Sequence, residues 1–227
     1  MIFGGITLIS AILAAVCVWN SSVSGIGWLW VLVGSFVGSF LGLTVLAFVV
    51  LMILCALVDM KKPQEHDSPF YRRAMHIYIE ALVNALRVRI HTKGMEKLPQ
   101  EGRFLLVCNH QHIGDPAVLL HAMPRSQLAF VGKKETGSMF VVNKMMHRTM
   151  CQFIDRENDR QALKVILKCI QMIKEDLASI AVFPEGYTSK DGKLHHFRPG
   201  VFKIAQKAKV PIVVCTLRNT LHVMHNV

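Results

Sequence analysis

The sequence predicts an α/β domain with a mostly parallel sheet flanked by helices, preceded by an N-terminal hydrophobic helical hairpin. Two observations support this prediction. Residues 1–58 contain no Asp, Glu, Lys, Arg or His, and after residue 103 short apolar runs alternate with stretches of helical periodicity. We therefore expect a membrane-embedded hairpin at 1–58, a basic amphipathic linker helix at 59–87 and the α/β domain at 88–227.

The hairpin comes first along the chain. Residues 1–19 and 28–58 are apolar runs separated by the turn-like segment NSSVSGIG. About 20 apolar residues cross a bilayer as a helix, so both runs are long enough. A buried helical pair in a soluble protein would need a polar face, and a cleaved signal peptide would begin with charge. Small residues at Gly34, Gly38 and Gly42 either let two helices approach closely or have no special contact.

Charge sets the expected orientation and partners. The loop between the two runs is uncharged, whereas four basic residues follow the second run: Lys61, Lys62, Arg72 and Arg73. The positive-inside rule then places residue 59 onward in the cytoplasm. The formal net charge of +11 belongs entirely to this part of the chain and favours anionic lipid headgroups and phosphorylated substrates. We expect no nucleic-acid partner, because no nucleic-acid-binding signature is visible.

The remaining elements are predicted in chain order. Residues 69–86 have apolar side chains at helical spacing and predict an amphipathic helix suited to a membrane surface, and alternation from Val88 predicts a half-exposed strand ending at Gly94. Five apolar runs predict the other strands, at 104–108, 128–132, 151–154, 180–183 and 211–217. Helices are expected at 116–123, 138–148, 158–178 and 199–208.

Polar clusters follow four of these strands directly. They are NHQHIGD after the first, KKE after the second, Asp155 with Arg156 after the third, and PEGYTSKDGK after the fourth. In parallel α/β sheets, ligands bind at the carboxyl ends of the strands. We therefore expect these clusters to form one site.

His110 and Asp115 suggest acid–base chemistry within the first cluster. The pair Asp115-Pro116 is a typical helix start, with Asp as N-cap and Pro at the first helical position. A carboxylate held there can also orient a histidine five residues earlier, which then takes a proton. No Ser or Cys is placed as an obvious nucleophile, so the nucleophile is expected to belong to the substrate.

Zinc is the alternative for this cluster, with His110, His112 and Asp115 as ligands. Catalytic zinc needs three converging ligands, and alternate residues leaving a strand point apart. Neither HExxH nor a Cys pair supports the metal. We therefore expect no metal and no cofactor.

Glu185 ends the fourth strand and is followed by Gly186 and a polar loop with Lys190 and Lys193. This segment fits an ordinary turn between strand and helix. It also fits a functional carboxylate with Arg156 as partner, or a site in which Arg156 contacts a phosphate.

Together, these blocks resemble a known family. NHQHIGD, FIDR, FPEG and VPIV, in this order, resemble the four-block signature of the glycerolipid acyltransferases, most closely the 1-acyl-glycerol-3-phosphate acyltransferases, over residues 88–217. The resemblance implies that His110 is the general base and Asp115 its partner. It also implies that Arg156 contacts the phosphate of the acceptor and that Glu185 and Gly186 belong to the acceptor site.

Two positions depart from that family. Glu-Gly is usually followed by Thr-Arg, but here Tyr187 and Thr188 follow, so the arginine is missing. A glycine is common where this chain has Met150. Thr188 still offers a neutral hydrogen bond. The remaining candidate cations for a phosphate are Arg156, Lys133, Lys190, Lys193 and Arg198.

The sequence thus predicts an integral membrane acyltransferase with its catalytic domain at 88–227 on the cytoplasmic face. The resemblance implies transfer of an acyl chain from acyl-CoA or acyl carrier protein to lysophosphatidic acid, which gives phosphatidic acid in phospholipid biosynthesis. Acylation of another lysophospholipid or of glycerol 3-phosphate stays open. So do a metal-dependent lipid hydrolase and a non-catalytic lipid-binding membrane protein.

Overall fold

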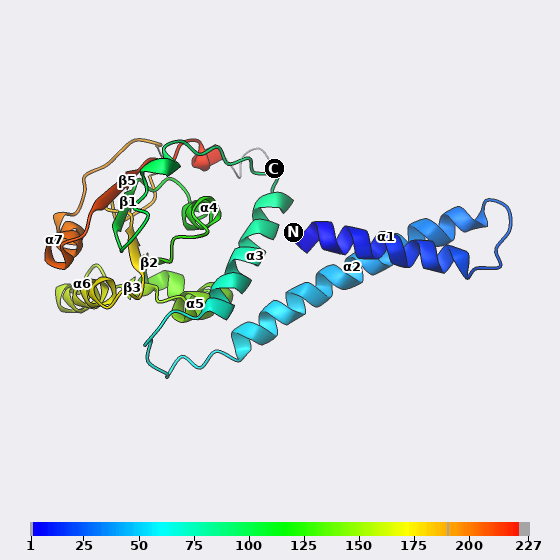
Figure 1. Cartoon of the computed structure of the whole chain (residues 1–227), viewed down its shortest axis with the longest axis horizontal. Helices are drawn as coiled ribbons and strands as arrows, with labels where there is room; N and C mark the ends of the chain where they lie inside the picture. Colours follow the sequence, from blue (N-terminus) through cyan, green and yellow to red (C-terminus); the bar gives the residue numbers. More distant parts are fainter. Residues whose placement is uncertain (1, 190, 223–227) are drawn as a thin grey trace. The chain divides into compact units, whose positions relative to one another are not determined.

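The computed structural model describes residues 2–189 and 191–222 (Figure 1). The chain divides after Asp59 into two compact units. The first unit contains the apolar N-terminal helices, and the second contains the sheet and the remaining helices.

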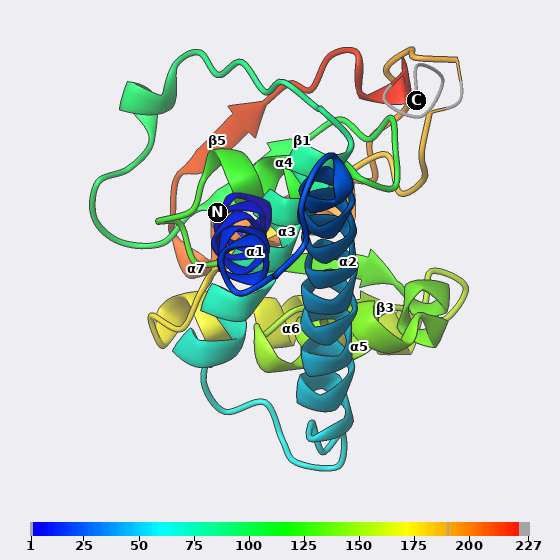
Figure 2. The ribbon, with the colours of Figure 1, turned by 90° about the vertical axis from the view of Figure 1, so that its right-hand side faces the viewer.

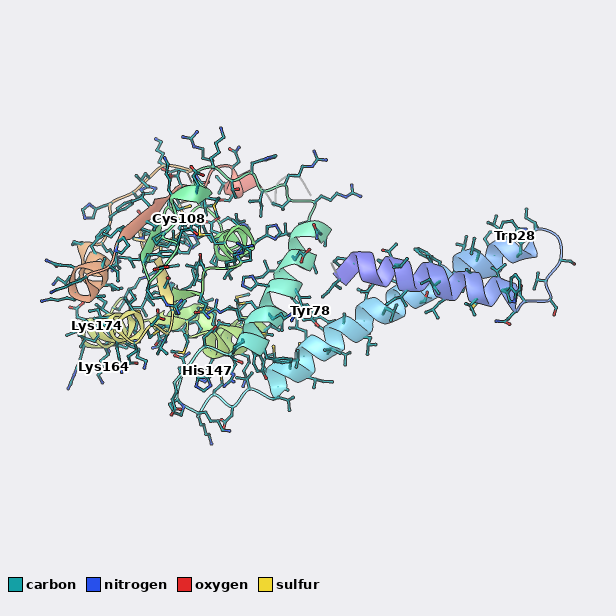
Figure 3. The ribbon with its side chains drawn as sticks, viewed as in Figure 1. Trp28, Tyr78, Cys108, His147, Lys164 and Lys174 are labelled. Carbon is teal, nitrogen blue, oxygen red and sulfur yellow. The ribbon has the colours of Figure 1, made fainter. Side chains whose placement is uncertain are left out.

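The first unit is a pair of helices, α1 (Ile2–Trp19) and α2 (Gly27–Ala56). Both are long and apolar enough to cross a membrane. At 1.5 Å per residue they measure about 27 and 45 Å, against a hydrocarbon core of about 30 Å. All three tryptophans of the chain, Trp19, Trp28 and Trp30, lie at the loop end of this pair, where Trp28 is labelled in Figure 3. Tryptophan favours the membrane–water interface, so the loop end is suited to that position.

One face of α1 is buried, whereas the glycines of α2 are not in close contact with it. Ile6, Ser10 and Ala14 are the buried residues of α1. A Cβ added at Gly34, Gly38 or Gly42 would meet no atom within 4 Å, so these glycines do not mediate a close approach within this unit. The hydroxyls of α2 are satisfied internally, as Thr44 Oγ1 donates to the carbonyl of Phe40 at 2.8 Å.

The second unit contains a five-stranded parallel sheet of order β3-β2-β4-β1-β5, which confirms the predicted fold class. Figure 2 shows β5 and β3 at opposite ends of the sheet. The strands are β1 (Leu105–Cys108), β2 (Leu128–Lys133), β3 (Gln152–Ile154), β4 (Ser179–Val182) and β5 (Ile212–Cys215). Each overlaps an apolar run from which a strand was predicted, although β2 ends one residue later and β4 begins one residue earlier than its run. The central strands β1 and β4 are buried throughout, as apolar runs in a parallel sheet indicate.

Helices cover both faces of this sheet (Figure 1). The longer helices are α3 (Pro69–Ala85), α4 (Asp115–Ala122), α5 (Phe140–Arg148), α6 (Asp159–Lys174) and α7 (Lys203–Ala208). Short 3-10 helices lie at η1 (Met95–Lys97), η2 (Lys134–Ser138), η3 (Pro199–Phe202) and η4 (Thr220–His222). One core layer joins α6 and α7 to the sheet, and the other joins α3 and α4 to its opposite face.

Helix α3 packs against the α/β domain. Its Met75 and Ile79 lie against the core layer that contains α4. Arg72 is buried, where its guanidinium pairs with Asp67 at 2.6 Å and donates to the carbonyl of Leu128 at 3.0 Å. Part of the apolar stripe that suggested a membrane-surface helix therefore packs on the domain, whereas Leu82 of the same helix stays exposed.

The prediction of a strand from Val88 to Gly94 is wrong. These residues have no regular structure and pair with no strand among the residues described. Alternation of apolar and polar residues indicates an extended, half-exposed chain, but a strand also needs a partner with free backbone groups. Within 2–189 and 191–222, no strand pairs with this segment.

Candidate active site

The carboxyl edge of the sheet gathers the polar clusters, as the sequence predicts. His110 follows β1, Glu185 follows β4, Lys133 ends β2 and Arg156 follows β3. Since all the strands are parallel, these four positions lie on the same edge. The order β3-β2-β4-β1 places His110 and Glu185 on neighbouring strands and Lys133 and Arg156 on the other side of β4.

His110 and Asp115 form the pair expected from the sequence. His110 Nδ1 lies 2.8 Å from Asp115 Oδ2, and Asp115 is fully buried. The same oxygen accepts the backbone N–H groups of Gln111 at 2.7 Å and His112 at 2.9 Å. Burial raises the pKa of Asp115, but the hydrogen bonds outweigh it, led by that from His110, and the net pKa is lowered. The carboxylate is therefore ionised and can only accept, so Nδ1 is the donor, and in the neutral imidazole the lone pair lies on Nε2.

The imidazole of His110 is held from several sides. Its ring stacks on Phe183, with centroids 4.1 Å apart and planes 18° from parallel. Its backbone N–H donates to Glu185 Oε1 at 3.0 Å, and its carbonyl accepts from the Ser189 N–H at 2.7 Å. The side chain keeps 17% of its surface exposed, so a substrate can reach it.

Asp115 is not the N-cap of helix α4. The helix begins at Asp115 itself, and Gly114 occupies the cap position without a side-chain hydrogen bond. The carboxylate turns back toward the two preceding N–H groups because it binds the loop after β1 and His110 at once. The cap assignment from the sequence is therefore wrong, and the orienting role for which Asp115 was also considered fits the geometry.

Glu185 faces inward, with only 1% of its surface exposed. Its two oxygens accept the backbone N–H groups of His110 at 3.0 Å and His195 at 3.1 Å. Among the residues described, it makes no ion pair with Arg156, the partner considered from the sequence. The carboxylate therefore links the loop after β1 to the loop before α7.

A cavity of about 450 Å³ opens beside the loops after β2 and β3. Its lining includes two predicted substrate-binding residues, Lys133 and Arg156; the others are Lys134, Glu135, Ile154, Asp155 and Glu157. Lys133 is partly neutralised by Glu135, at 3.2 Å, and Lys134 by Asp155, at 3.1 Å. Arg156 is half-buried, and burial followed by the charge of Arg198 lowers its pKa.

The loop after Glu185 is fixed by its own hydrogen bonds. Gly186 has a φ of 84°, a left-handed conformation that favours glycine. Ser189 Oγ lies 2.8 Å from both Asp191 Oδ1 and the carbonyl of Lys193. The predicted Thr188 is half-buried in this loop, Lys193 is exposed, and Lys190 lies outside the described residues.

Asn109 contributes a contact that the sequence did not indicate. Its amide accepts from the Leu217 N–H at 2.7 Å and donates to the Leu217 carbonyl at 3.0 Å. These two hydrogen bonds fix the end of β1, directly before His110, to the chain leaving β5. Its position as the first residue of the NHQHIGD block was the only available signal.

The donors considered for zinc do not converge. His112 Nδ1 accepts the N–H of Gly114 at 3.0 Å, so this ring nitrogen is already engaged in its own loop. Within 2–189 and 191–222, no three His, Cys, Asp or Glu residues are grouped as a metal site would require.

Comparison with known proteins identifies the family to which the chain belongs. The profile of the Acyltransferase family matches residues 89–218. The chain belongs to the acyltransferase family, whose members transfer acyl groups.

Individual relatives carry more specific names. A probable 1-acyl-sn-glycerol-3-phosphate acyltransferase of Mycoplasma genitalium is 30% identical over 80% of this chain and 70% of its own length. A second from Mycoplasma pneumoniae is 28% identical over 76% and 67%. The chloroplastic 1-acyl-sn-glycerol-3-phosphate acyltransferase BAT2 of Brassica napus is 31% identical over 68% of this chain, which spans 45% of that protein.

A solved structure shares the fold. It is the crystal structure of the 1-acyl-sn-glycerophosphate acyltransferase PlsC from Thermotoga maritima, with a TM-score of 0.57 and 22% sequence identity. The match covers 76% of this chain and 67% of that one.

Proposed function

We propose that this protein is a 1-acyl-sn-glycerol-3-phosphate O-acyltransferase, which esterifies the free hydroxyl of lysophosphatidic acid and forms phosphatidic acid for phospholipid biosynthesis. The observation that carries this proposal is the 2.8 Å contact between His110 Nδ1 and the buried Asp115 carboxylate, which leaves Nε2 free as a base. The names of the relatives support the same acceptor.

The chemistry follows from this pair. His110 Nε2 takes the proton of the acceptor hydroxyl as its oxygen attacks the carbonyl carbon of an acyl thioester. Asp115 stabilises the imidazolium through the hydrogen on Nδ1. The tetrahedral intermediate collapses with cleavage of the C–S bond, and the departing thiolate takes the proton back from His110. An ester and a free thiol result, and no cofactor is consumed.

The cations at the carboxyl edge account for a phosphate-bearing acceptor. A phosphate monoester carries up to two negative charges and needs fixed cations or N–H donors when it leaves water. Arg156 and Lys133 line the cavity beside the loops after β2 and β3 and are the proposed contacts. Gly186 and Thr188 lie on the adjacent loop, which Glu185 holds against His110.

Helices α1 and α2 suit this function as a membrane anchor, because the acceptor and the product both reside in the bilayer. The basic residues after α2 favour the cytoplasmic side for the catalytic domain, where acyl-CoA and acyl carrier protein are found. Membrane lipids are therefore the expected surroundings and nucleic acid is not an expected partner.

An acceptor panel tests the proposal. Purified protein in lipid nanodiscs is given one isotopically labelled acyl-CoA and, separately, lysophosphatidic acid, other lysophospholipids or glycerol 3-phosphate, and the product mass is recorded. Phosphatidic acid should form fastest, and a strong chelator should not slow it. A faster product from another acceptor would reassign the substrate, whereas loss of activity with chelator would indicate a metal-dependent enzyme.

A further inference from the structure

The arginine that the family resemblance leads one to expect at position 188 is replaced here by threonine. The structure brings another guanidinium to the same turn. Arg198 Nε lies 3.0 Å from the point that a Cβ on Gly186 would occupy, and Arg156 Cζ lies 3.8 Å from that point. Two guanidinium groups from separate segments therefore meet at Gly186.

Arg198 is held in place by its own short segment. Its backbone N–H donates to the carbonyl of Pro184 at 2.9 Å, which ties it to the turn that carries Glu185. The preceding Phe197 packs near Phe202, with ring centroids 6.4 Å apart, and Phe202 lies against the core. Pro199 then begins η3. The backbone of Arg198 is thus anchored on both sides, and its side chain points back to Gly186.

The charges around these two arginines are not balanced by protein carboxylates. In the described part of the chain, neither Arg156 nor Arg198 makes an ion pair, whereas Lys133 and Lys134 each have an acidic partner. Two cations held close together repel each other, and Arg156 is also half-buried. A dianion between them would relieve this repulsion and accept several N–H donors at once.

We propose that Arg198, together with Arg156, binds the acceptor's phosphate monoester and thereby determines specificity in place of the arginine absent at position 188. This inference rests on the proposed function. The cation comes from the loop before α7 rather than from the turn after β4, so Thr188 needs to supply no charge. Gly186 permits this arrangement because any Cβ there would meet Arg198 Nε at 3.0 Å.

A charge-relocation experiment tests this assignment. Arg198→Ala should raise the KM for lysophosphatidic acid at least about tenfold, with a smaller change in kcat, because a charge-assisted contact to the acceptor is lost. Adding Thr188→Arg to Arg198→Ala should restore most of the lost affinity, because the new guanidinium starts from the same turn. Arg198→Lys should fall between wild type and Arg198→Ala. Lys207→Ala, which removes an exposed cation on α7, is the matched control and should leave KM unchanged.

Substrate variation identifies which phosphate is bound. The acceptor without phosphate, a monoacylglycerol, should be used poorly by wild type and should show no further loss with Arg198→Ala. Arg198→Ala should not change the KM for acyl-CoA. The KM for acyl-dephospho-CoA, which lacks the 3′-phosphate, should likewise be the same for wild type and for Arg198→Ala. A rise confined to the KM of acyl-CoA would overturn the inference and assign the pair to the donor.

Failure of the inference and failure of the proposed function give different results. If wild type makes phosphatidic acid but Arg198→Ala keeps a normal acceptor KM, the role of Arg198 is refuted and the function stands. If wild type prefers acceptors without phosphate, the proposed function is itself refuted. Should Arg198→Ala lose its thermal unfolding transition, Arg198→Gln is measured instead, and an unchanged acceptor KM in that variant refutes the inference.

Discussion

Replacing Asp115 by Asn tests how the carboxylate prepares His110. One Asp115 oxygen accepts three hydrogen bonds, at 2.8 Å from His110 Nδ1, 2.7 Å from Gln111 N and 2.9 Å from His112 N. An amide has only one acceptor oxygen and no charge, so the imidazolium formed during catalysis loses its counter-ion. General-base catalysis contributes about 10²- to 10⁴-fold to a rate, and we expect Asp115→Asn to lower kcat within that range.

The same substitution should lower stability. Hydrogen bonds to a charged acceptor contribute about 1.5 to 3 kcal/mol each. Because the amide oxygen of Asn remains as a weaker, neutral acceptor, the unfolding free energy should fall by only about 2 to 4 kcal/mol. Because the folded state lowers the pKa of Asp115, its stabilisation is complete above the unfolded pKa of about 4 and is lost as the pH falls through the lower folded value. Asp115→Asn should therefore weaken the acid dependence of unfolding.

The assays are acyl-transfer kinetics at saturating substrate and thermal unfolding between about pH 3 and pH 7. Asp176→Asn is the control, because Asp176 is an exposed carboxylate paired with Arg103 at 2.7 Å, outside the site. It should keep normal kcat. A normal kcat for a folded Asp115→Asn protein would refute the orienting role of this carboxylate.

Three further predictions concern other parts of the chain. Met150→Gly should relieve a left-handed φ of 66° but empty a fully buried position, so the unfolding free energy should fall by about 1 to 3 kcal/mol, and a rise in Tm would contradict this. In a cysteine-free background, a thiol reagent added outside intact cells should label Ser22→Cys and should not label Glu65→Cys. Labelling of Glu65→Cys alone would reverse the orientation, and protection of both would indicate a hairpin that does not cross the membrane. Glu185→Gln should reduce kcat more than acceptor KM, because it weakens the support of the His110 backbone, and a KM effect alone would indicate direct contact with substrate.

The strands and the catalytic pair could be predicted because their signals are local. A strand of a parallel sheet is a short apolar run, and each of the five predicted runs overlaps one observed strand. His110 and Asp115 lie five residues apart on one loop, so little beyond the strand end was needed to bring them together. The prediction of a strand from Val88 was wrong because the alternation of apolar and polar residues does not indicate whether a partner strand is present.

The rest of the site depends on contacts between distant segments. Glu185 meets the backbone of His110, and Arg198 meets Gly186, through the exact path of the loop between them. Nothing in the residue types ranks Arg198 above Lys193 as the second cation; only the anchoring of its backbone does. Similarly, Gln64 follows the apolar hairpin in sequence, yet its amide donates to the His147 carbonyl at 3.0 Å, which is why Glu65 is the better position for labelling.

The role of His110 as the general base is tested by the turnover of purified His110→Ala protein with lysophosphatidic acid and labelled acyl-CoA, measured as phosphatidic acid by mass. His110 Nε2 is the proposed base, and its ring makes its side-chain hydrogen bond only to Asp115 among the described residues, so the variant should fold. We predict that kcat falls at least about 100-fold while the thermal unfolding transition remains cooperative. Phosphatidic acid formation at a near-normal rate would contradict the account.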